Sequence, residues 1–237
     1  MKIARSIDLD FLATGGRHSS SSTLGSLHNG LAIDLGELDS VSVDAEAGTL
    51  TVGGGTRFGQ IFEDVYAAGY QMREYSSAHK SLHARLTIRL ATGSCACPGM
   101  VGAAVGGGIG RYQGVDGLII DSILSVNLVT ATGDLITVSE DSYPDLFWGI
   151  RGAAPNFGII TEATFQLHPL LNEGQFLSAD FMLPASSNKA YFDMLETFQD
   201  DMPPELSTIS IIQYNSTSEE VWLATLNSLL LLWPILT

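Results

Sequence analysis

Closely spaced glycines mark the part of this sequence that could bind a ligand. The stretch from Ala91 to Asp121 contains nine of them, interleaved with apolar residues such as Val101, Val105 and Ile109. Glycine between apolar residues marks a backbone that needs a positive φ angle, or one that another group approaches very closely. Main-chain N–H groups that hold a large anionic cofactor would require both properties. Tightly packed turns in a hydrophobic core are the alternative explanation.

A second polar turn rich in glycine lies near the start of the sequence, at TGGRHSSSSTLG (residues 14–25). Gly15 and Gly16 could direct successive N–H groups at an anion, as phosphate-binding turns do. A solvated surface loop would have the same composition. Two common nucleotide-binding motifs do not fit. A Rossmann turn that starts at Gly106 would need glycine at Arg111, and a P-loop needs a Gly-Lys pair that the sequence lacks.

The composition argues against several classes of protein. A chain of 237 residues with 45% hydrophobic and 16% charged residues can build a proper core. A net charge of −15 argues against a nucleic-acid partner. The longest apolar run, residues 229–235, is too short to span a bilayer, so no membrane partner is expected. Cys95 and Cys97 cannot form a disulfide framework or a zinc site, so no metal is expected. No signal peptide is expected at Met1, and the localisation stays open.

The hydrophobic periodicity predicts many strands with helices between them. Residues 1–13 are expected to contain the end of a helix and a short strand, and residues 123–130 and 134–139 a hairpin. The remaining expected elements are strands at 31–35, 41–43, 49–52 and 157–167, a helix at 58–68 capped by Gly69, and a helix that begins at Pro144. Because helices intervene irregularly, the predicted fold class is α+β rather than a doubly wound sheet.

Four blocks of the sequence point to one family. They are FLATGGRH (11–18), AIDLGELDSVSVDAEAGTLTVGGGTRFGQIF (32–62), TGSCACPGMVGAAVGGGIGRYQGVDGLIIDSI (92–123) and PDLFWGIRGAAPNFGIIT (144–161). In type and order these blocks resemble the FAD-linked oxidases of the vanillyl-alcohol oxidase and berberine-bridge-enzyme type, especially their fungal secondary-metabolism branch. The resemblance covers nearly all of residues 1–170 and is weaker beyond them.

The resemblance implies a PCMH-type FAD-binding domain of two α+β subdomains in residues 1–172, followed by an incomplete substrate domain in residues 173–237. It implies FAD as cofactor, hydride transfer to the flavin from a small, secondary-metabolite-like organic substrate, and dioxygen as acceptor. It assigns no catalytic base to any residue of this chain. The cofactor-binding residues that it implies are Gly15, Gly16, Arg17, His18, Ser19, Gly93, Cys95, Val101, Gly102, Gly106, Gly107, Gly108, Gly117, Asp121, Asn156, Phe157, Gly158, Ile159 and Ile160.

Three of these residues raise specific expectations. His18 matches the histidine that bonds covalently to the flavin 8α-methyl group in many relatives, and Cys95 matches the cysteine that bonds the flavin in bicovalent members. Arg17 stands where the family normally has glycine. Its side chain would either obstruct the pyrophosphate or offer that anion a guanidinium.

Residues 73–90 have no counterpart in the family and are expected to be an insertion. They contain four of the 11 basic residues of the chain and a single acidic one, so the composition changes abruptly. The codons of Arg73–Tyr75 can contain a splice donor, and those of Leu90–Ala91 a splice acceptor. We therefore hypothesise that the segment is a translated intron; a surface loop or a short basic helix is the alternative.

Two further functions remain open. Compared with the family, the sequence starts inside the first FAD subdomain and stops within the substrate domain. The chain could therefore be a catalytically inactive remnant that binds FAD weakly or associates with a complete paralogue. It could also be a flavin dehydrogenase that passes electrons to a partner instead of oxygen. The substrate and the oligomeric state are not predicted.

Overall fold

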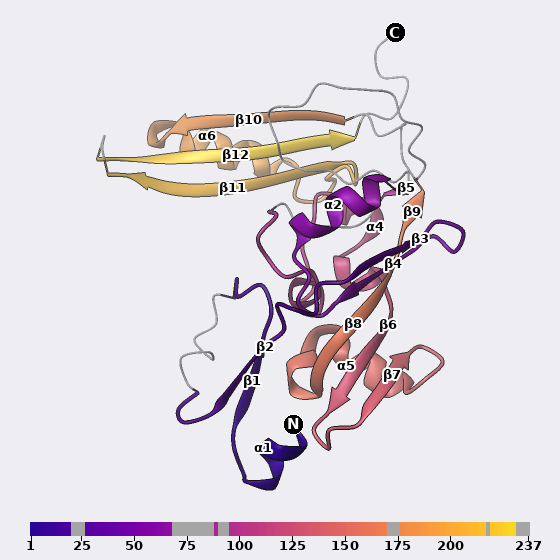
Figure 1. Cartoon of the computed structure of the whole chain (residues 1–237). Helices are drawn as coiled ribbons and strands as arrows, with labels where there is room; N and C mark the ends of the chain where they lie inside the picture. The colour runs from indigo at the N-terminus through magenta and orange to yellow at the C-terminus, as the bar shows by residue number, and fades with distance from the viewer. Residues whose placement is uncertain (20–26, 68–87, 90–94, 170–175, 217–218, 231–237) are drawn as a thin grey trace. The chain divides into compact units, whose positions relative to one another are not determined.

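The computed structural model describes residues 1–19, 27–67, 88–89, 95–169, 176–216 and 219–230 (Figure 1). The chain divides into two compact units. The first comprises residues 1–110 and 116–170, and the second comprises residues 111–115 and 171–237. The expected C-cap Gly69 and most of the expected insertion at 73–90 lie outside the described residues. The intron hypothesis stays a prediction, and the sequence of the mature transcript tests it.

A five-stranded antiparallel sheet forms the centre of the first unit, in the order β3-β4-β8-β6-β7. Its strands are β3 (Val41–Asp44), β4 (Thr49–Gly53), β6 (Ile123–Thr130), β7 (Leu135–Ser139) and β8 (Gly158–Gln166). All five were expected, because apolar and polar residues alternate along them. The β6–β7 hairpin turns at Gly133, whose φ of +79° explains the glycine there. β8 begins one residue later than expected because Phe157 is the C-cap of a short 3₁₀-helix, η3 (Ala154–Asn156).

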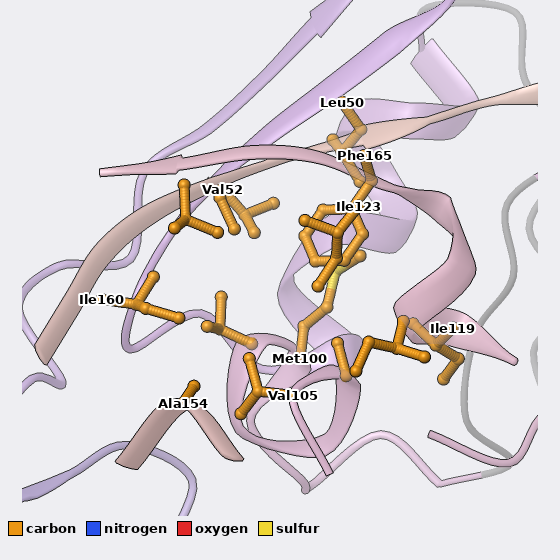
Figure 2. Packing of buried hydrophobic residues seen from close by; sticks show 14 of the residues in the cluster. Leu50, Val52, Met100, Val105, Ile119, Ile123, Ala154, Ile160 and Phe165 are labelled. Carbon is orange, nitrogen blue, oxygen red and sulfur yellow. The ribbon is translucent and has the colours of Figure 1, made fainter. Parts of the chain in front are cut away.

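The hydrophobic core lies on one face of this sheet. Phe165 of β8 and Leu50 of β4 are fully buried, and Figure 2 shows them beside Ile123 and Met100. The helical elements that bring buried residues to this core are α2 (Phe58–Ala67), α3 (Met100–Ala104), η2 (Ile119–Ser122) and α5 (Pro144–Ala153). Sheet and helices therefore share one core, and the α+β class is confirmed.

The opposite face of the sheet carries polar side chains that bind one another. The Thr51 and Thr164 hydroxyls lie 3.0 Å apart across β4 and β8. Asn127 of β6 donates to Glu162 of β8 at 2.9 Å and accepts from the Thr137 hydroxyl at 2.8 Å. This alternation of apolar and polar faces fixes the register, since a slip of one residue would bury the polar set.

The first unit also contains several short elements outside the five-stranded sheet. A parallel pair, β1 (Phe11–Thr14) and β2 (Leu31–Asp34), follows the short helix α1 (Lys2–Ser6). β5 (Ile88–Arg89) pairs with β9 (His168–Pro169).

The second unit contains a three-stranded antiparallel sheet in the order β10-β12-β11, formed by β10 (Phe176–Pro184), β11 (Leu206–Asn215) and β12 (Glu220–Leu230). It also contains η5 (Ala185–Ser187) and α6 (Asn188–Glu196), while α4 (Gln113–Asp116) spans the boundary between the units.

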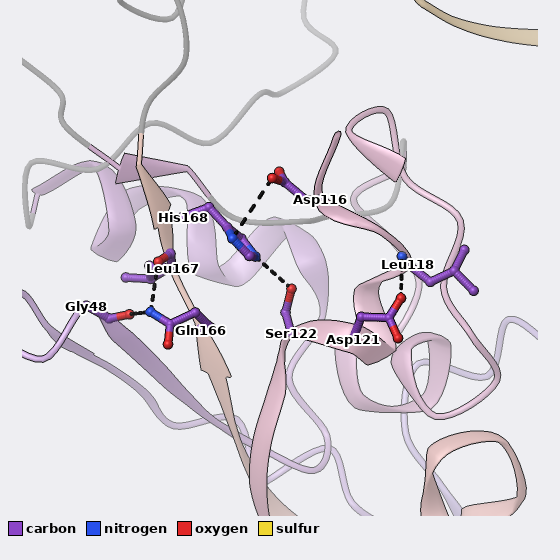
Figure 3. Close-up of polar contacts among 8 residues, drawn as sticks. All are labelled: Gly48, Asp116, Leu118, Asp121, Ser122, Gln166, Leu167 and His168. Atoms are coloured by element: carbon purple, nitrogen blue, oxygen red, sulfur yellow. Dashed lines mark hydrogen bonds and ion pairs between the residues drawn. The ribbon is translucent and has the colours of Figure 1, made fainter. Parts of the chain in front are cut away.

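Polar contacts fasten the chain just beyond β8 to the turn before β6 (Figure 3). The His168 Nε2 atom lies 3.0 Å from the Ser122 hydroxyl, and its Nδ1 atom lies 3.9 Å from an Asp116 carboxylate oxygen. These are the residue types of a hydrolytic triad, but the Ser122 side chain is only 1% exposed. A buried hydroxyl cannot reach a substrate, so the three residues hold the fold together rather than acting as a nucleophilic site.

Asp134 ties α1 to the β6–β7 turn. A hydrogen bond from the Thr132 hydroxyl at 2.7 Å, and then the Lys2 ammonium at 3.5 Å, hold the pKa of Asp134 below its usual range. A carboxyl group whose pKa is lower in the folded state stabilises the fold above its unfolded pKa of about 3.9, and this stabilisation is lost as the pH falls through the folded pKa.

We therefore expect Asp134→Asn to lower the urea midpoint at pH 7. The difference from the parent protein should shrink steadily as the pH falls from about 4 towards 2. Urea titrations at a series of pH values measure it. A difference that stays constant across that range would contradict the assignment.

Candidate functional site

A pocket in the first unit has a volume of about 640 Å³, which is within the range of about 300–1,000 Å³ that is typical of ligand sites. Three segments far apart in the sequence supply most of its wall: residues 11–19, 98–105 and 154–160. Met1, Leu35, Gly54 and Ala131 complete it. The wall is mostly apolar, with polar groups concentrated in the loop after β1.

At Gly15 and Gly16 that loop presents backbone to the pocket. A Cβ atom on Gly16 would lie 2.1 Å from the backbone nitrogen of Gly99, so only glycine permits this approach. Among the described residues, the amides of Gly15 and Gly16 donate no hydrogen bond to another part of the chain. Two adjacent amides without an internal partner can bind an anion. His18 and Ser19 follow them and also line the pocket.

Arg17 adopts a left-handed conformation, with φ of +53°. Its guanidinium forms an ion pair with Asp34 at the end of β2, and its Nε donates weakly to the Thr14 hydroxyl at 3.4 Å. A backbone hydrogen bond from Gly36 is the main reason that the pKa of Asp34 is lowered, and the Arg17 charge adds to this effect. The guanidinium is thus held beside the loop, at the border of the pocket.

Helix α3 forms a second wall, from which Val101 and Gly102 line the pocket. Val101 is buried in the core, whereas Gly102 is exposed. A Cβ atom on Gly102 would meet no heavy atom within 4 Å. Since Gly102 lines the pocket, any side chain placed there would extend into free space at its wall.

The third wall is formed by η3 and the first residues of β8. Asn156, Phe157, Gly158, Ile159 and Ile160 all line the pocket. Gly158 has φ of +156°, and a Cβ atom there would lie 2.3 Å from the Val129 carbonyl oxygen. The chain therefore passes close to β6 as it enters the sheet, which places Phe157 at the pocket with 39% of its surface exposed.

Twelve of the residues expected at the site line this pocket, and six others lie elsewhere in the described part of the chain. Cys95 is exposed and does not line it. Gly106, Gly107, Gly108, Gly117 and Asp121 build the turns between α3 and β6 instead. The φ angles of Gly107, Gly108 and Gly117 are positive, and Asp121 accepts the Leu118 amide at 2.9 Å (Figure 3). Gly93 lies outside the described residues. A cofactor role stays a prediction for all nineteen residues, the twelve at the pocket included.

Several pocket residues were not expected from the sequence. Thr14, Leu35 and Gly54 line the wall around the first loop. Gly54 could have been identified from the sequence, because the three successive glycines Gly53–Gly55 indicate a close approach of backbones. A Cβ atom on Gly54 would indeed lie 2.2 Å from the Ile160 carbonyl oxygen. The remaining pocket residues are ordinary side chains with no distinguishing pattern.

In the part of the chain that the structure describes, no group of three or more histidine, cysteine, aspartate or glutamate residues could hold a metal ion. Among the same residues, no helix is long and apolar enough to cross a membrane.

Comparisons with known proteins show what this chain is similar to. The family described as FAD binding domain matches residues 1–82. The FAD-linked oxidoreductase OXR1 of Pyricularia oryzae is 44% identical over 93% of this chain, and the FAD-linked oxidoreductase fogF of Aspergillus ruber is 42% identical over 93%. The chain spans only 39% and 41% of the lengths of these two relatives.

Solved structures share the fold. 6-Hydroxy-D-nicotine oxidase from Arthrobacter nicotinovorans superposes with a TM-score of 0.77 and 25% identity, over 96% of this chain and 46% of its own. Berberine bridge enzyme from Eschscholzia californica superposes with a TM-score of 0.74 over 98% of this chain and 43% of its own. Its identity of 20% shows the fold alone.

Proposed function

We propose that the chain is a member of the FAD-linked oxidoreductases of the vanillyl-alcohol oxidase and berberine-bridge-enzyme type, that its pocket binds FAD and that the protein is an oxidoreductase. The observation that carries the proposal is a pocket of about 640 Å³ with a wall of bare backbone at Gly15–Gly16. We assign the pyrophosphate to these amides, and the flavin to the walls at Val101–Gly102 and 156–160.

The residues present fit such a cofactor. A dinucleotide combines a flat apolar ring system with a doubly charged pyrophosphate. The apolar wall, with Val101, Phe157 and Ile160, suits the ring system. The pair of amides at Gly15 and Gly16 suits the anion, because main-chain N–H groups bind phosphate without a side chain. The chain carries a net charge of −15, so an anion needs such a local site to bind.

Bound FAD would supply the redox chemistry, accepting a hydride from a small organic substrate and passing the electrons to dioxygen. The part of this chain is to hold and orient the cofactor and to exclude water from its apolar wall. Residues 173–237 are proposed to begin the substrate domain. Nothing in the described residues distinguishes one substrate from another, so the substrate class rests on the family.

His18 is the residue we propose for a covalent bond to the flavin. It lines the pocket and is exposed there, so its ring is accessible to a bound molecule. Cys95 does not line the pocket, which makes it the weaker candidate for a second bond.

An absorption spectrum of the purified chain, with and without added FAD, tests the proposal. We expect flavin bands that remain with the protein after acid precipitation. The variant His18→Ala should bind FAD but lose all of its flavin on precipitation. A folded sample that stays colourless with excess FAD would favour the inactive remnant instead.

The electron acceptor can be tested without knowing the substrate. The bound flavin is reduced by light under nitrogen in the presence of EDTA, which donates the electrons and is oxidised, and air is then admitted. An oxidase should reoxidise rapidly, with one hydrogen peroxide formed for each flavin. Slow reoxidation in air, with rapid reoxidation by an artificial dye, would instead identify a dehydrogenase.

A further inference from the structure

A polar cleft of about 350 Å³ adjoins the pocket. Arg17, Asp34, Arg57 and Gln60 line it, together with three glycines. It shares Gly15 and Arg17 with the proposed cofactor pocket. A molecule that lies over the Gly15 amide is therefore at the border of both cavities.

The amides at the start of helix α2 do not give this cleft an attraction for an anion, because they already donate hydrogen bonds to other groups of the chain. The Arg57 amide donates to the Gln60 side-chain oxygen at 2.8 Å, and the Phe58 amide donates to the Pro98 carbonyl at 3.1 Å. The Gln60 side-chain nitrogen donates to Asp39 at 3.1 Å. Apart from the Gly15 amide at its border, the attraction of the cleft for an anion must therefore come from the two guanidinium groups.

These guanidiniums differ in their partners. Arg17 is paired with Asp34, whose other oxygen accepts the Gly36 amide at 2.9 Å. Within the described residues, the Arg57 guanidinium makes no ion pair. Asp34 thus neutralises one of two positive charges, and the cleft retains a net positive charge in an acidic chain.

We propose that Arg17 and Arg57 form a phosphate subsite that binds the pyrophosphate of FAD where it crosses Gly15 and Gly16. Asp34 is the internal counter-ion that holds the Arg17 guanidinium at the border until the phosphate arrives. Arg17 therefore does not obstruct the cofactor; it supplies charge-assisted hydrogen bonds to it. The inference rests on the proposed function, since it assigns a part of the same cofactor.

Binding of FAD, riboflavin and ADP to Arg17→Gly and to Arg57→Gln tests the subsite. Each variant should bind FAD and ADP about 10-fold or more weakly than the parent protein, with a smaller dependence on salt. Binding of riboflavin, which has no phosphate, should not change. Glycine adopts a φ of +53° without strain, so Arg17→Gly relieves a backbone cost and its folding is not endangered.

Arg151→Gln is the matched control. Arg151 is an exposed arginine of the same unit that lies 5.3 Å over the Phe147 ring and lines neither cavity. It should leave all three affinities unchanged.

The outcomes separate the two proposals. FAD affinities that do not change in Arg17→Gly and Arg57→Gln would overturn the subsite and leave FAD binding intact. If the parent protein binds ADP in an arginine-dependent manner but not FAD, the subsite stands and the proposed function fails. Equal losses for FAD and riboflavin would also overturn the subsite, since the arginines would then act on the fold.

Discussion

Phe165→Ala is expected to lower the free energy of unfolding by about 3–5 kcal/mol, the usual cost of removing a fully buried aromatic ring. Phe165 has no exposed surface and lies on β8, which pairs with both β4 and β6. Its ring contributes to the core beside Leu50, Ile123 and Met100 (Figure 2). Because small domains are stable by only about 5–15 kcal/mol in total, such a loss should be visible as a large fall in the urea midpoint.

Thr164→Ala is its control on the same strand. Thr164 points to the polar face, where its hydroxyl lies 3.0 Å from that of Thr51. Loss of that contact should cost about 1 kcal/mol. If both substitutions cost the same, the core does not lie on the face of the sheet described above.

The second large effect is expected at Gly102. A tryptophan at this position should weaken FAD binding by about 100-fold or more, because its side chain would occupy a pocket wall that must be close-packed against the cofactor. The fold should survive, since a Cβ atom at Gly102 meets nothing within 4 Å. Fluorescence titration with FAD measures the affinity, and circular dichroism measures the fold.

Gly102→Ala separates helix propensity from occlusion. Alanine should stabilise α3 by about 0.5–1 kcal/mol relative to glycine, and should leave most of the FAD affinity in place. A tryptophan variant that binds FAD as tightly as the parent protein would show that the flavin does not lie on α3.

Elements with a clear hydrophobic period could be predicted from the sequence. The β6–β7 hairpin and helix α2 were expected nearly at their observed bounds, because alternation and helical spacing depend on neighbouring residues only. The predicted start of strand β8 at Phe157 was wrong by one residue, because η3 extends the turn before β8. That extension depends on how the chain approaches β6, which no local pattern contains.

The site could be predicted only in part. Gly15 and Gly102 were expected and line the pocket. Gly107 and Gly108 look the same in the sequence, but in the structure their positive φ angles turn the chain between α3 and β6. In the sequence, a glycine that lines a binding pocket cannot be distinguished from a glycine that forms a turn. The fold is needed to tell them apart. Leu35 and Ala131 join the wall because distant segments meet there, which composition cannot show.

The contact between Gly16 and Gly99 has a consequence for how sequences of this kind can diverge. A Cβ atom on Gly16 would lie 2.1 Å from the Gly99 nitrogen, and one on Gly99 would lie 2.9 Å from the Gly16 nitrogen. Neither loop can acquire a side chain there unless the other retreats. The two positions, 83 residues apart in the numbering, should therefore be inherited as a pair, and a lineage that loses one glycine should soon lose the other.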